Sequence, residues 1–264
     1  MISSIRIWLA FLWVAMGLAA LLPLVSLGMR TGLYQPNRLR RWCHGLIVRA
    51  LGFRVHVHGT IAPVRPLLLA ANHISWTDVM VLASFNDVSF IAKSQMSRWP
   101  LIGWMARLQR CVFVERERKR KSGEQASEIA TRLAAGDAMV LFAEGTTGDG
   151  NLILPFKSTL FGAAALAIDE GAVDQVFIQP VAISYTRLHG LPMGRQHRRV
   201  AAWIGDQDLL PHIKLLLAEG AVDVEVHFGE PVAFSAGTNR KETARRMEAQ
   251  VRTMMQQALR GPRS

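Results

Sequence analysis

The first part of the chain is a long apolar segment. Ile7–Met29 contains no charged residue and lies between Arg6 and Arg30. A helix of this length reaches about 34 Å, which is enough to cross the hydrocarbon core of a bilayer. Pro23 and Gly28 also allow a kinked helical hairpin that lies in one leaflet, and a buried core helix is the remaining alternative. The pattern predicts a membrane-inserted helix or helical hairpin.

After residue 50, short apolar runs alternate with helical spacings. Phe53–His58 alternates with a period of two, which is typical of an edge strand, and Leu67–Ala71 is a bounded apolar run typical of a buried strand. Further strands are predicted at 90–92, 111–114, 138–143, 176–185, 200–204 and 222–228. Helices are predicted from residue 77 onward and over 122–136, 158–170 and 244–258. This alternation predicts an α/β fold with a mixed, mostly parallel sheet flanked by helices.

Composition adds a strong positive charge. The chain has 31 basic and 20 acidic residues, and its net charge of +11 favours an anionic partner such as a phospholipid surface. Basic residues are denser after the apolar segment than before it, which predicts that the rest of the chain stays on the cytoplasmic side. Only Cys43 and Cys111 are present, so a disulfide scaffold is excluded. We divide the chain into a membrane-inserting segment with a basic flank, residues 1–50, and an α/β domain, residues 51–264.

Polar residues interrupt the pattern directly after the predicted strand at 67–71. His73 lies in the turn at the carboxyl end of that strand, where open α/β sheets bind their ligands. Asp78 opens the following helix and can accept a hydrogen bond from one imidazole nitrogen, which leaves the other nitrogen as a proton acceptor. Two alternatives remain open at this point: a catalytic pair, or a helix-capping aspartate beside a hydrogen-bonded turn histidine.

Other predicted strands also end in polar residues. The loop Glu144–Gly150 is rich in glycine, which lets backbone N–H groups approach an anion, although ordinary turns share this composition. Arg116 begins a basic run that is either a solvated surface or a contact with an anionic ligand or membrane. His56 and His58 lie on one face of their strand and are metal ligands or, the interpretation we favour, surface histidines.

Four stretches of the chain, taken in sequence order, resemble the motifs of the glycerolipid acyltransferases of the lysophosphatidic acid acyltransferase type. Asn72-His73 followed by Asp78 is similar to the family's first motif, His-x4-Asp. Three further stretches of this chain are similar to the family's other motifs. The second motif is matched by Lys93, Pro100, Gly103 and Phe113–Arg116, the third by Phe142–Thr146 and the fourth by Gln179-Pro180-Val181.

Two positions depart from the family pattern. Ala143 stands in place of the usual Pro, and Thr147 stands in place of an Arg that helps to hold the phosphate of the acceptor. The sequence that follows, including Lys157 and Trp203–Asp206, is similar to a bacterial branch that acylates lyso-ornithine lipid. That acceptor has no phosphate, so the missing Arg is consistent with this branch.

The resemblance implies a membrane-bound O-acyltransferase whose acyltransferase domain is residues 51–264. It would move a fatty acyl group from acyl carrier protein or coenzyme A to the hydroxyl of a lysolipid, either lyso-ornithine lipid, 1-acylglycerol-3-phosphate or both. His73 and Asp78 would be catalytic. The substrate-binding residues would be Lys93, Arg116, Glu144, Gly145, Thr146, Thr147 and Lys157.

The same resemblance implies no metal, cofactor, covalent acyl-enzyme or nucleic acid. It places the protein at the bacterial inner membrane, with the domain on the cytoplasmic side. A membrane-tethered basic module that binds acyl carrier protein or anionic lipid without catalysis is the alternative.

Overall fold

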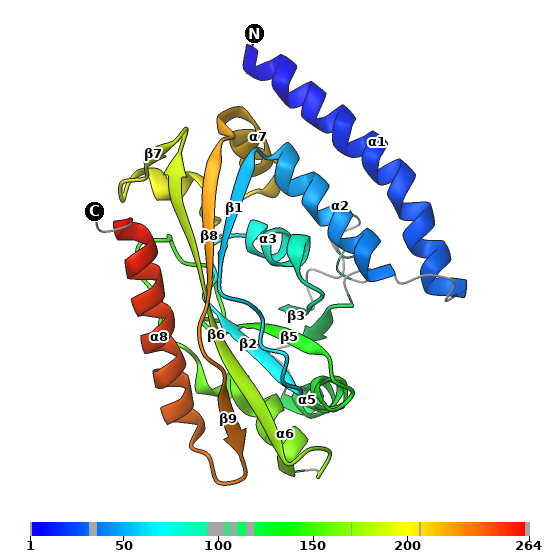
Figure 1. The fold of residues 1–264 in the computed structure, drawn as a ribbon, viewed down its shortest axis with the longest axis vertical. Coiled ribbons are helices and arrows are strands. Elements are labelled where there is room, and N and C mark those ends of the chain that lie inside the picture. Colours follow the sequence, from blue (N-terminus) through cyan, green and yellow to red (C-terminus); the bar gives the residue numbers. More distant parts are fainter. Residues whose placement is uncertain are drawn as a thin grey trace.

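The computed structural model describes residues 2–31, 36–93, 103, 106, 110–114, 119–169, 171–205 and 207–261. In this part of the chain, helices flank one mixed sheet (Figure 1). The strands are β1 (Phe53–His58), β2 (Leu67–Ala71), β3 (Ser89–Lys93), β4 (Val112–Val114), β5 (Ala138–Phe142), β6 (Gln175–Leu188), β7 (Leu191–Pro192), β8 (Val222–Phe228) and β9 (Val232–Ser235). The α-helices are α1 (Ile2–Thr31), α2 (Pro36–Ala50), α3 (Thr77–Phe85), α5 (Lys119–Ala134), α6 (Gly162–Asp169), α7 (Leu209–Glu219) and α8 (Arg240–Arg260), with 3-10 turns η2 (Ser158–Phe161) and η3 (His197–Val200).

The sheet has the order β1-β8-β6-β2-β5-β3-β4, with β7 and β9 also paired to β6. Strand β2 is parallel to both of its neighbours, β5 and β6, and β3 is parallel to β5 and β4. Strand β8 runs antiparallel to β6 and parallel to the edge strand β1. The predicted fold class, a mixed and mostly parallel sheet flanked by helices, is confirmed.

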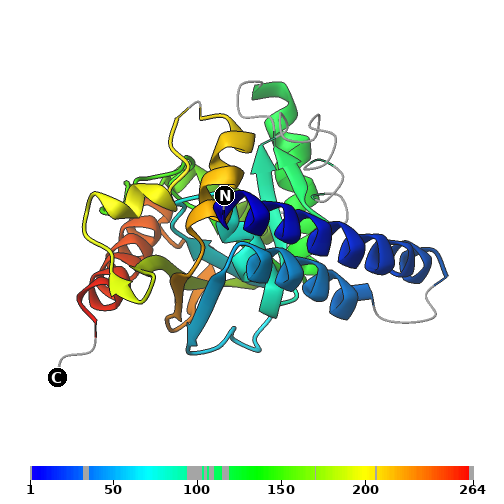
Figure 2. The same cartoon turned by 90° about the horizontal axis from the view of Figure 1, so that it is seen from above.

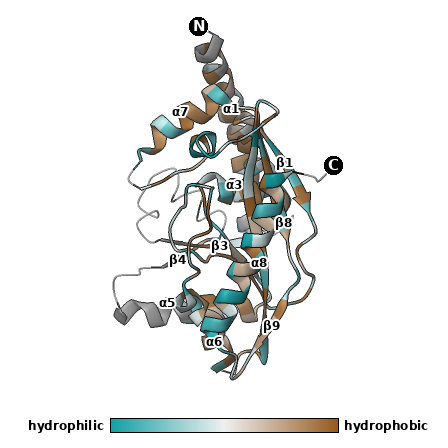
Figure 3. Cartoon of the chain, turned by 90° about the vertical axis from the view of Figure 1, so that its left-hand side faces the viewer, coloured by the Kyte–Doolittle hydropathy of each residue, from teal (hydrophilic) through white to brown (hydrophobic). Residues whose placement is uncertain are grey.

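Two apolar clusters fill the faces of the sheet. One contains residues of α2, α3 and α7, and the other contains residues of α5, α6 and α8. All five residues of β2 are buried, because this strand is covered on both faces. The predicted C-terminal stripe packs on the sheet, with Ala244, Met247 and Val251 buried, while the opposite side of α8 is hydrophilic (Figure 3).

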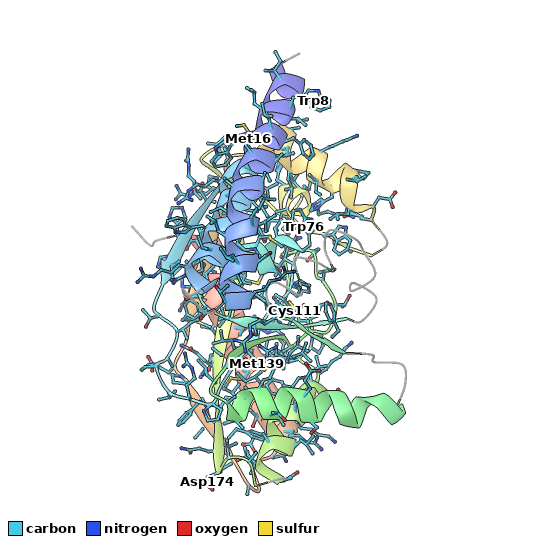
Figure 4. The ribbon with its side chains drawn as sticks, turned by 90° about the vertical axis from the view of Figure 1, so that its right-hand side faces the viewer. Trp8, Met16, Trp76, Cys111, Met139 and Asp174 are labelled. Atoms are coloured by element: carbon cyan, nitrogen blue, oxygen red, sulfur yellow. The ribbon has the colours of Figure 1, made fainter. Side chains whose placement is uncertain are left out.

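The N-terminal helices α1 and α2 lie side by side as a helical pair (Figures 1 and 2). Gly17 of α1 faces the side chain of Leu46 in α2, and an added Cβ at that position would clash with it. Ile7–Gly28 has a mean hydropathy of 2.2 and is long and apolar enough, by length and composition, to cross a membrane. Trp8 and Met16 of this helix are exposed and lie at the opposite end of the molecule from Asp174 (Figure 4).

Some predicted elements differ from the structure. Residues 200–204 do not form a strand: η3 ends at Val200, and Ala201 and Ala202 are both fully buried although they are adjacent. The backbone N–H groups of Ala201 and Ala202 both donate to the Arg198 carbonyl, at 3.1 and 3.2 Å, so the chain here continues as a turn instead of pairing with a strand. The helix predicted to begin at residue 122 begins at Lys119, and the one predicted over 158–170 is the turn η2 followed by α6.

Candidate active site

The turn after β2 places His73 at the carboxyl edge of the sheet, as predicted. Ala71, the last residue of β2, is in register with Phe142 of β5 and Val181 of β6. The segments that follow β2 and β5 therefore leave the same edge side by side. The imidazole of His73 stacks on the Phe142 ring with centroids 3.9 Å apart and an angle of 16° between the planes. This contact fixes the plane of the imidazole, whose side chain remains 20% exposed.

Asp78 lies fully buried behind His73 and pairs with it. His73 Nδ1 is 2.9 Å from Asp78 Oδ2, so the protonated Nδ1 donates to the carboxylate. The backbone N–H groups of Ile74 and Ser75 donate to the same oxygen at 2.6 and 2.9 Å. Asp78 is thus not a side-chain cap of α3, because it binds N–H groups that precede the helix. A buried carboxylate needs several donors to compensate for lost hydration, and here the backbone turn supplies two of them.

The other carboxylate oxygen of Asp78 is bound by Tyr185, which no motif in the sequence singles out. Tyr185 Oη donates to Asp78 Oδ1 at 2.7 Å and lies 2.6 Å from Thr77 Oγ1. Burial, followed by the charge of Asp78, raises the pKa of the Tyr185 phenol well above its usual range. The phenol therefore keeps its proton and acts as a donor that holds Asp78 in place.

Asn72 has a structural role that its place in the motif does not predict. Its side-chain amide donates to the carbonyl oxygen of Ile183 at 3.0 Å, and its carbonyl accepts from the Ile183 N–H at 2.8 Å. Both residues lie beyond the paired part of β2 and β6, so the amide extends the ladder by one step. It fixes the start of the catalytic turn to β6, two residues before Tyr185.

Glu144 follows β5 and binds the same turn from the other side. Its Oε1 accepts from the backbone N–H of His73 at 3.1 Å, and its Oε2 accepts from that of Leu154 at 3.2 Å. The residue is buried, and burial raises the pKa of its carboxyl to about 8 against the lowering effect of these two hydrogen bonds. Nearby negative charge on Asp78 and Glu248 contributes a smaller part of the same increase in the pKa. Glu144 therefore contacts the protein's own backbone and joins the His73 turn to residue 154.

The glycine-rich loop after Glu144 packs closely under His73. Gly148 donates its N–H to the His73 carbonyl at 2.8 Å, and Gly145 donates to the Phe142 carbonyl at 3.0 Å. Gly145 and Gly150 have positive φ values of 73° and 75°, which suit glycine. Because the Gly145 N–H closes this turn, it is not directed at a substrate.

The remaining predicted site residues are placed differently. Thr146 and Lys157 are exposed and Thr147 is partly buried, and Lys157 donates its backbone N–H to the Ala143 carbonyl at 2.9 Å. The backbone of Lys93 ends β3, on the far side of β5 from β2. The side chain of Lys93 and the whole of Arg116 lie outside the described residues. The structure brings His73, Asp78 and Glu144 together, and it adds Tyr185 and Asn72 to them.

This arrangement can perform general-base chemistry. With Nδ1–H bound to Asp78, the neutral imidazole carries its lone pair on Nε2, where it can accept a proton. Asp78 also stabilises the imidazolium that forms after proton transfer. The site is thus a preorganised base at the end of a strand in an open α/β sheet.

Comparison with known proteins agrees with this chemistry. A family model described as Acyltransferase matches residues 54–184, which include β2, β5, His73, Asp78 and Glu144. The chain belongs to the acyltransferase family, and it is an enzyme that transfers acyl groups rather than a binding module without catalysis.

Two relatives match nearly the whole chain. The lyso-ornithine lipid O-acyltransferase of Brucella abortus is 51% identical, with 99% of this chain and 98% of that protein covered. The protein of the same name from Rhizobium meliloti is 48% identical, with 99% and 89% covered. The fold is similar to that of PlsC, the 1-acyl-sn-glycerophosphate acyltransferase of Thermotoga maritima, with a TM-score of 0.65, 20% identity and 99% of both chains covered.

Proposed function

We propose that this chain is a lyso-ornithine lipid O-acyltransferase that takes its acyl group from a thioester of acyl carrier protein or coenzyme A. The observation that carries the proposal is the pair of His73 and buried Asp78 at the carboxyl end of β2. The pair occurs in a chain 51% identical, over nearly its full length, to a protein with that name. The acceptor is then the free hydroxyl of a lysolipid.

The transfer follows from the geometry of the pair. His73 Nε2 takes the proton of the acceptor hydroxyl while the hydroxyl oxygen attacks the thioester carbonyl carbon. The tetrahedral intermediate collapses by breaking the C–S bond, and the imidazolium returns its proton to the leaving thiolate. An ester and a free thiol are the products. Asp78 keeps Nδ1 protonated throughout, and the Phe142 ring holds the imidazole plane.

Glu144 supports this step by positioning the base. The backbone N–H of His73 donates to its carboxyl group, which ties the turn to the loop carrying Thr146 and Thr147. We assign contact with the acceptor to five of the remaining predicted positions, and the resemblance of the motifs supports this assignment: Thr146, Thr147, Lys157, Lys93 and Arg116.

The choice of acceptor depends on Thr147. An Arg at this position offers a fork of charged donors to a phosphate, whereas a Thr offers one neutral hydroxyl. The headgroup of lyso-ornithine lipid contains a carboxylate and an amine and no phosphate. Binding of such an acceptor is weakened little when the Arg is absent, because it has no phosphate to bind. Thr147 therefore favours lyso-ornithine lipid over 1-acylglycerol-3-phosphate.

Attachment to the membrane is part of the proposal. Helix α1 exposes large apolar side chains along its length, among them Trp8, Leu12 and Met16. Water is a poor solvent for this surface, and the interior of a bilayer is a good one. The basic residues that follow, such as Arg38 and Arg49, are exposed and suit the anionic cytoplasmic leaflet of the inner membrane. The reaction would then meet its lipid acceptor at that surface.

The test is acyl transfer by purified full-length protein to two acceptors side by side, lyso-ornithine lipid and 1-acylglycerol-3-phosphate. Each acceptor is paired once with acyl carrier protein thioester and once with coenzyme A thioester. We expect transfer to lyso-ornithine lipid at the higher kcat/KM, and the faster thioester identifies the donor. Transfer only to 1-acylglycerol-3-phosphate would contradict the assigned acceptor.

A further inference from the structure

A second cluster of ionisable side chains lies on β1 and β8, outside the acyl-transfer site. The two strands are parallel and in register, so that His58 is directly opposite His227. Along β8, Val222, Val224 and Val226 are buried in the core, and the alternate residues Asp223, Glu225 and His227 point to the other face. His56 and His58 of β1 share that face with them, because each forms an ion pair with a β8 carboxylate.

Three of these side chains converge on one point. Glu225 Oε2 lies 3.3 Å from His58 Nε2 and 3.2 Å from His227 Nε2. The two imidazoles are stacked with centroids 4.2 Å apart and planes at 12°, and the three ligand atoms all lie within 4.8 Å of one another. The other oxygen of Glu225 lies 3.5 Å from the hydroxyl of Thr186 on β6. His56 is not part of this group, because its Nε2 is bound to Asp223 at 2.8 Å.

The two nitrogen–oxygen distances fit a tetrahedral metal ion, and binding would require the exposed His58 ring to turn out of its stack with His227, because each Nε2 lone pair lies in the plane of its own ring. Zinc binds imidazole nitrogen and carboxylate oxygen at about 2.0–2.2 Å, so the edges of its tetrahedron measure roughly 3.3–3.5 Å. The two nitrogen–oxygen distances in the cluster are close to these edges. They are longer than a charge-assisted hydrogen bond, which measures about 2.7–2.9 Å. Two histidines and one glutamate are also a ligand set that Zn²⁺ uses, with a fourth position left for water.

We propose that His58, Glu225 and His227 form a binding site for a divalent transition-metal ion, Zn²⁺ in the first instance. The site is independent of the acyl-transfer reaction. Strand β6 lies between β8 and β2, and the cluster is on the face of β8 opposite to the core that contains Tyr185. An ion bound at this cluster would therefore not take part in the transfer step.

The proposed ion would stabilise the edge of the sheet by linking β1 to β8. Among the strands that the structure describes, β1 pairs only with β8, and it connects directly to α2 and the N-terminal helix pair. One ligand comes from β1 and two come from β8, so a bound ion would cross-link the edge strand to its neighbour. This link would stabilise the part of the domain on which α1 and α2 pack, and metal binding should raise the unfolding temperature.

The experiment is isothermal titration of ZnCl2 into full-length protein that was purified with a tag free of histidine and treated with a chelator. The variants are His58→Ala, His227→Ala and Glu225→Gln, and His56→Ala is the matched control on the same face of β1. We expect one ion per chain in the wild type and in His56→Ala. Loss of a group that only orients a metal ligand weakens binding by roughly 10–100-fold, so loss of a ligand itself should weaken Zn²⁺ binding by at least that factor. Thermal unfolding with and without Zn²⁺ should show an increase that His58→Ala abolishes.

Because His58 is half exposed, its replacement should leave the fold and the acyl-transfer rate unchanged, which separates loss of the site from loss of structure. Titration with Co²⁺ gives a second readout, since its visible absorption reports the coordination geometry. Failure of the wild type to bind Zn²⁺ would overturn the proposal and leave a hydrogen-bonded histidine–glutamate cluster. Equal binding by wild type and His58→Ala would overturn it as well, because the ion would then be held elsewhere.

Discussion

Replacement of Glu144 by Gln should change how the stability of the protein depends on pH. Glu144 is buried against two backbone N–H groups, and its pKa is about 8 instead of 4.5. A carboxyl group whose pKa is higher in the folded than in the unfolded chain binds its proton more tightly when folded. Its stabilising contribution is therefore complete below pH 4.5 and is lost as the pH rises to about 8.

The size of this effect follows from the two pKa values. The interval between 4.5 and about 8, at about 1.36 kcal/mol for each pH unit, gives at most about 5 kcal/mol. Gln has nearly the same shape as the protonated carboxyl and carries no charge at any pH. The free energy of unfolding of Glu144→Gln, relative to the wild type, should therefore rise by up to about 4 kcal/mol between pH 5 and pH 9, because the first part of the interval lies below pH 5.

Urea unfolding of both proteins in detergent at several pH values measures this difference. Glu128→Gln is the matched control. Glu128 is exposed on α5, so the same chemical change there should not alter how the free energy of unfolding depends on pH. If Glu144→Gln and the wild type lose stability in parallel from pH 5 to pH 9, Glu144 is ionised throughout. The account of its burial would then be refuted.

Three further substitutions test the supports of the site and the choice of acceptor. Tyr185→Phe removes a hydrogen bond to the Asp78 carboxylate, a type of bond worth about 1.5–3 kcal/mol, so kcat should fall about tenfold with the acceptor KM unchanged. An unchanged kcat would contradict this positioning role. Asn72→Ala leaves the N–H and carbonyl of Ile183 without their partner and should lower the free energy of unfolding by about 2–4 kcal/mol, measured by urea unfolding. A loss under about 0.5 kcal/mol would mean that water replaces the amide. Thr147→Arg should raise kcat/KM for 1-acylglycerol-3-phosphate about tenfold while that for lyso-ornithine lipid does not rise, and equal gains for both acceptors would refute the specificity argument.

The local parts of the site could be predicted from the sequence. His73 and Asp78 are five positions apart, so a strand followed by a turn and a helix is sufficient to bring them together. Tyr185 is 107 positions from Asp78, and its place in a long apolar strand gives no sign of a polar partner. Only the pairing of β6 beside β2 brings its hydroxyl to the carboxylate. The same long-range pairing explains the role of Asn72.

Two features are not predicted by the sequence pattern: the role of Glu144 and the conformation of residues 200–204. Glu144 follows a strand in a glycine-rich loop, and this position indicates a ligand contact. In the structure its buried carboxyl group instead accepts hydrogen bonds from the backbone N–H groups of His73 and Leu154. The apolar residues at 200–204 were expected to form a strand. They instead cross the catalytic turn, where Trp203 donates its backbone N–H to the Ile74 carbonyl at 2.9 Å. Neither outcome depends on local spacing, so the sequence pattern could not distinguish them.

The most direct test of the mechanism is the initial rate of acyl transfer to lyso-ornithine lipid by His73→Ala. The variant is compared with the wild type and with His197→Ala, an exposed histidine outside the site. Loss of a general base lowers the rate by about 10²–10⁴-fold, and we predict a loss in that range for His73→Ala at an unchanged unfolding temperature. His197→Ala should retain the wild-type rate. A His73→Ala rate within about threefold of the wild type would contradict the assignment of His73 as the base.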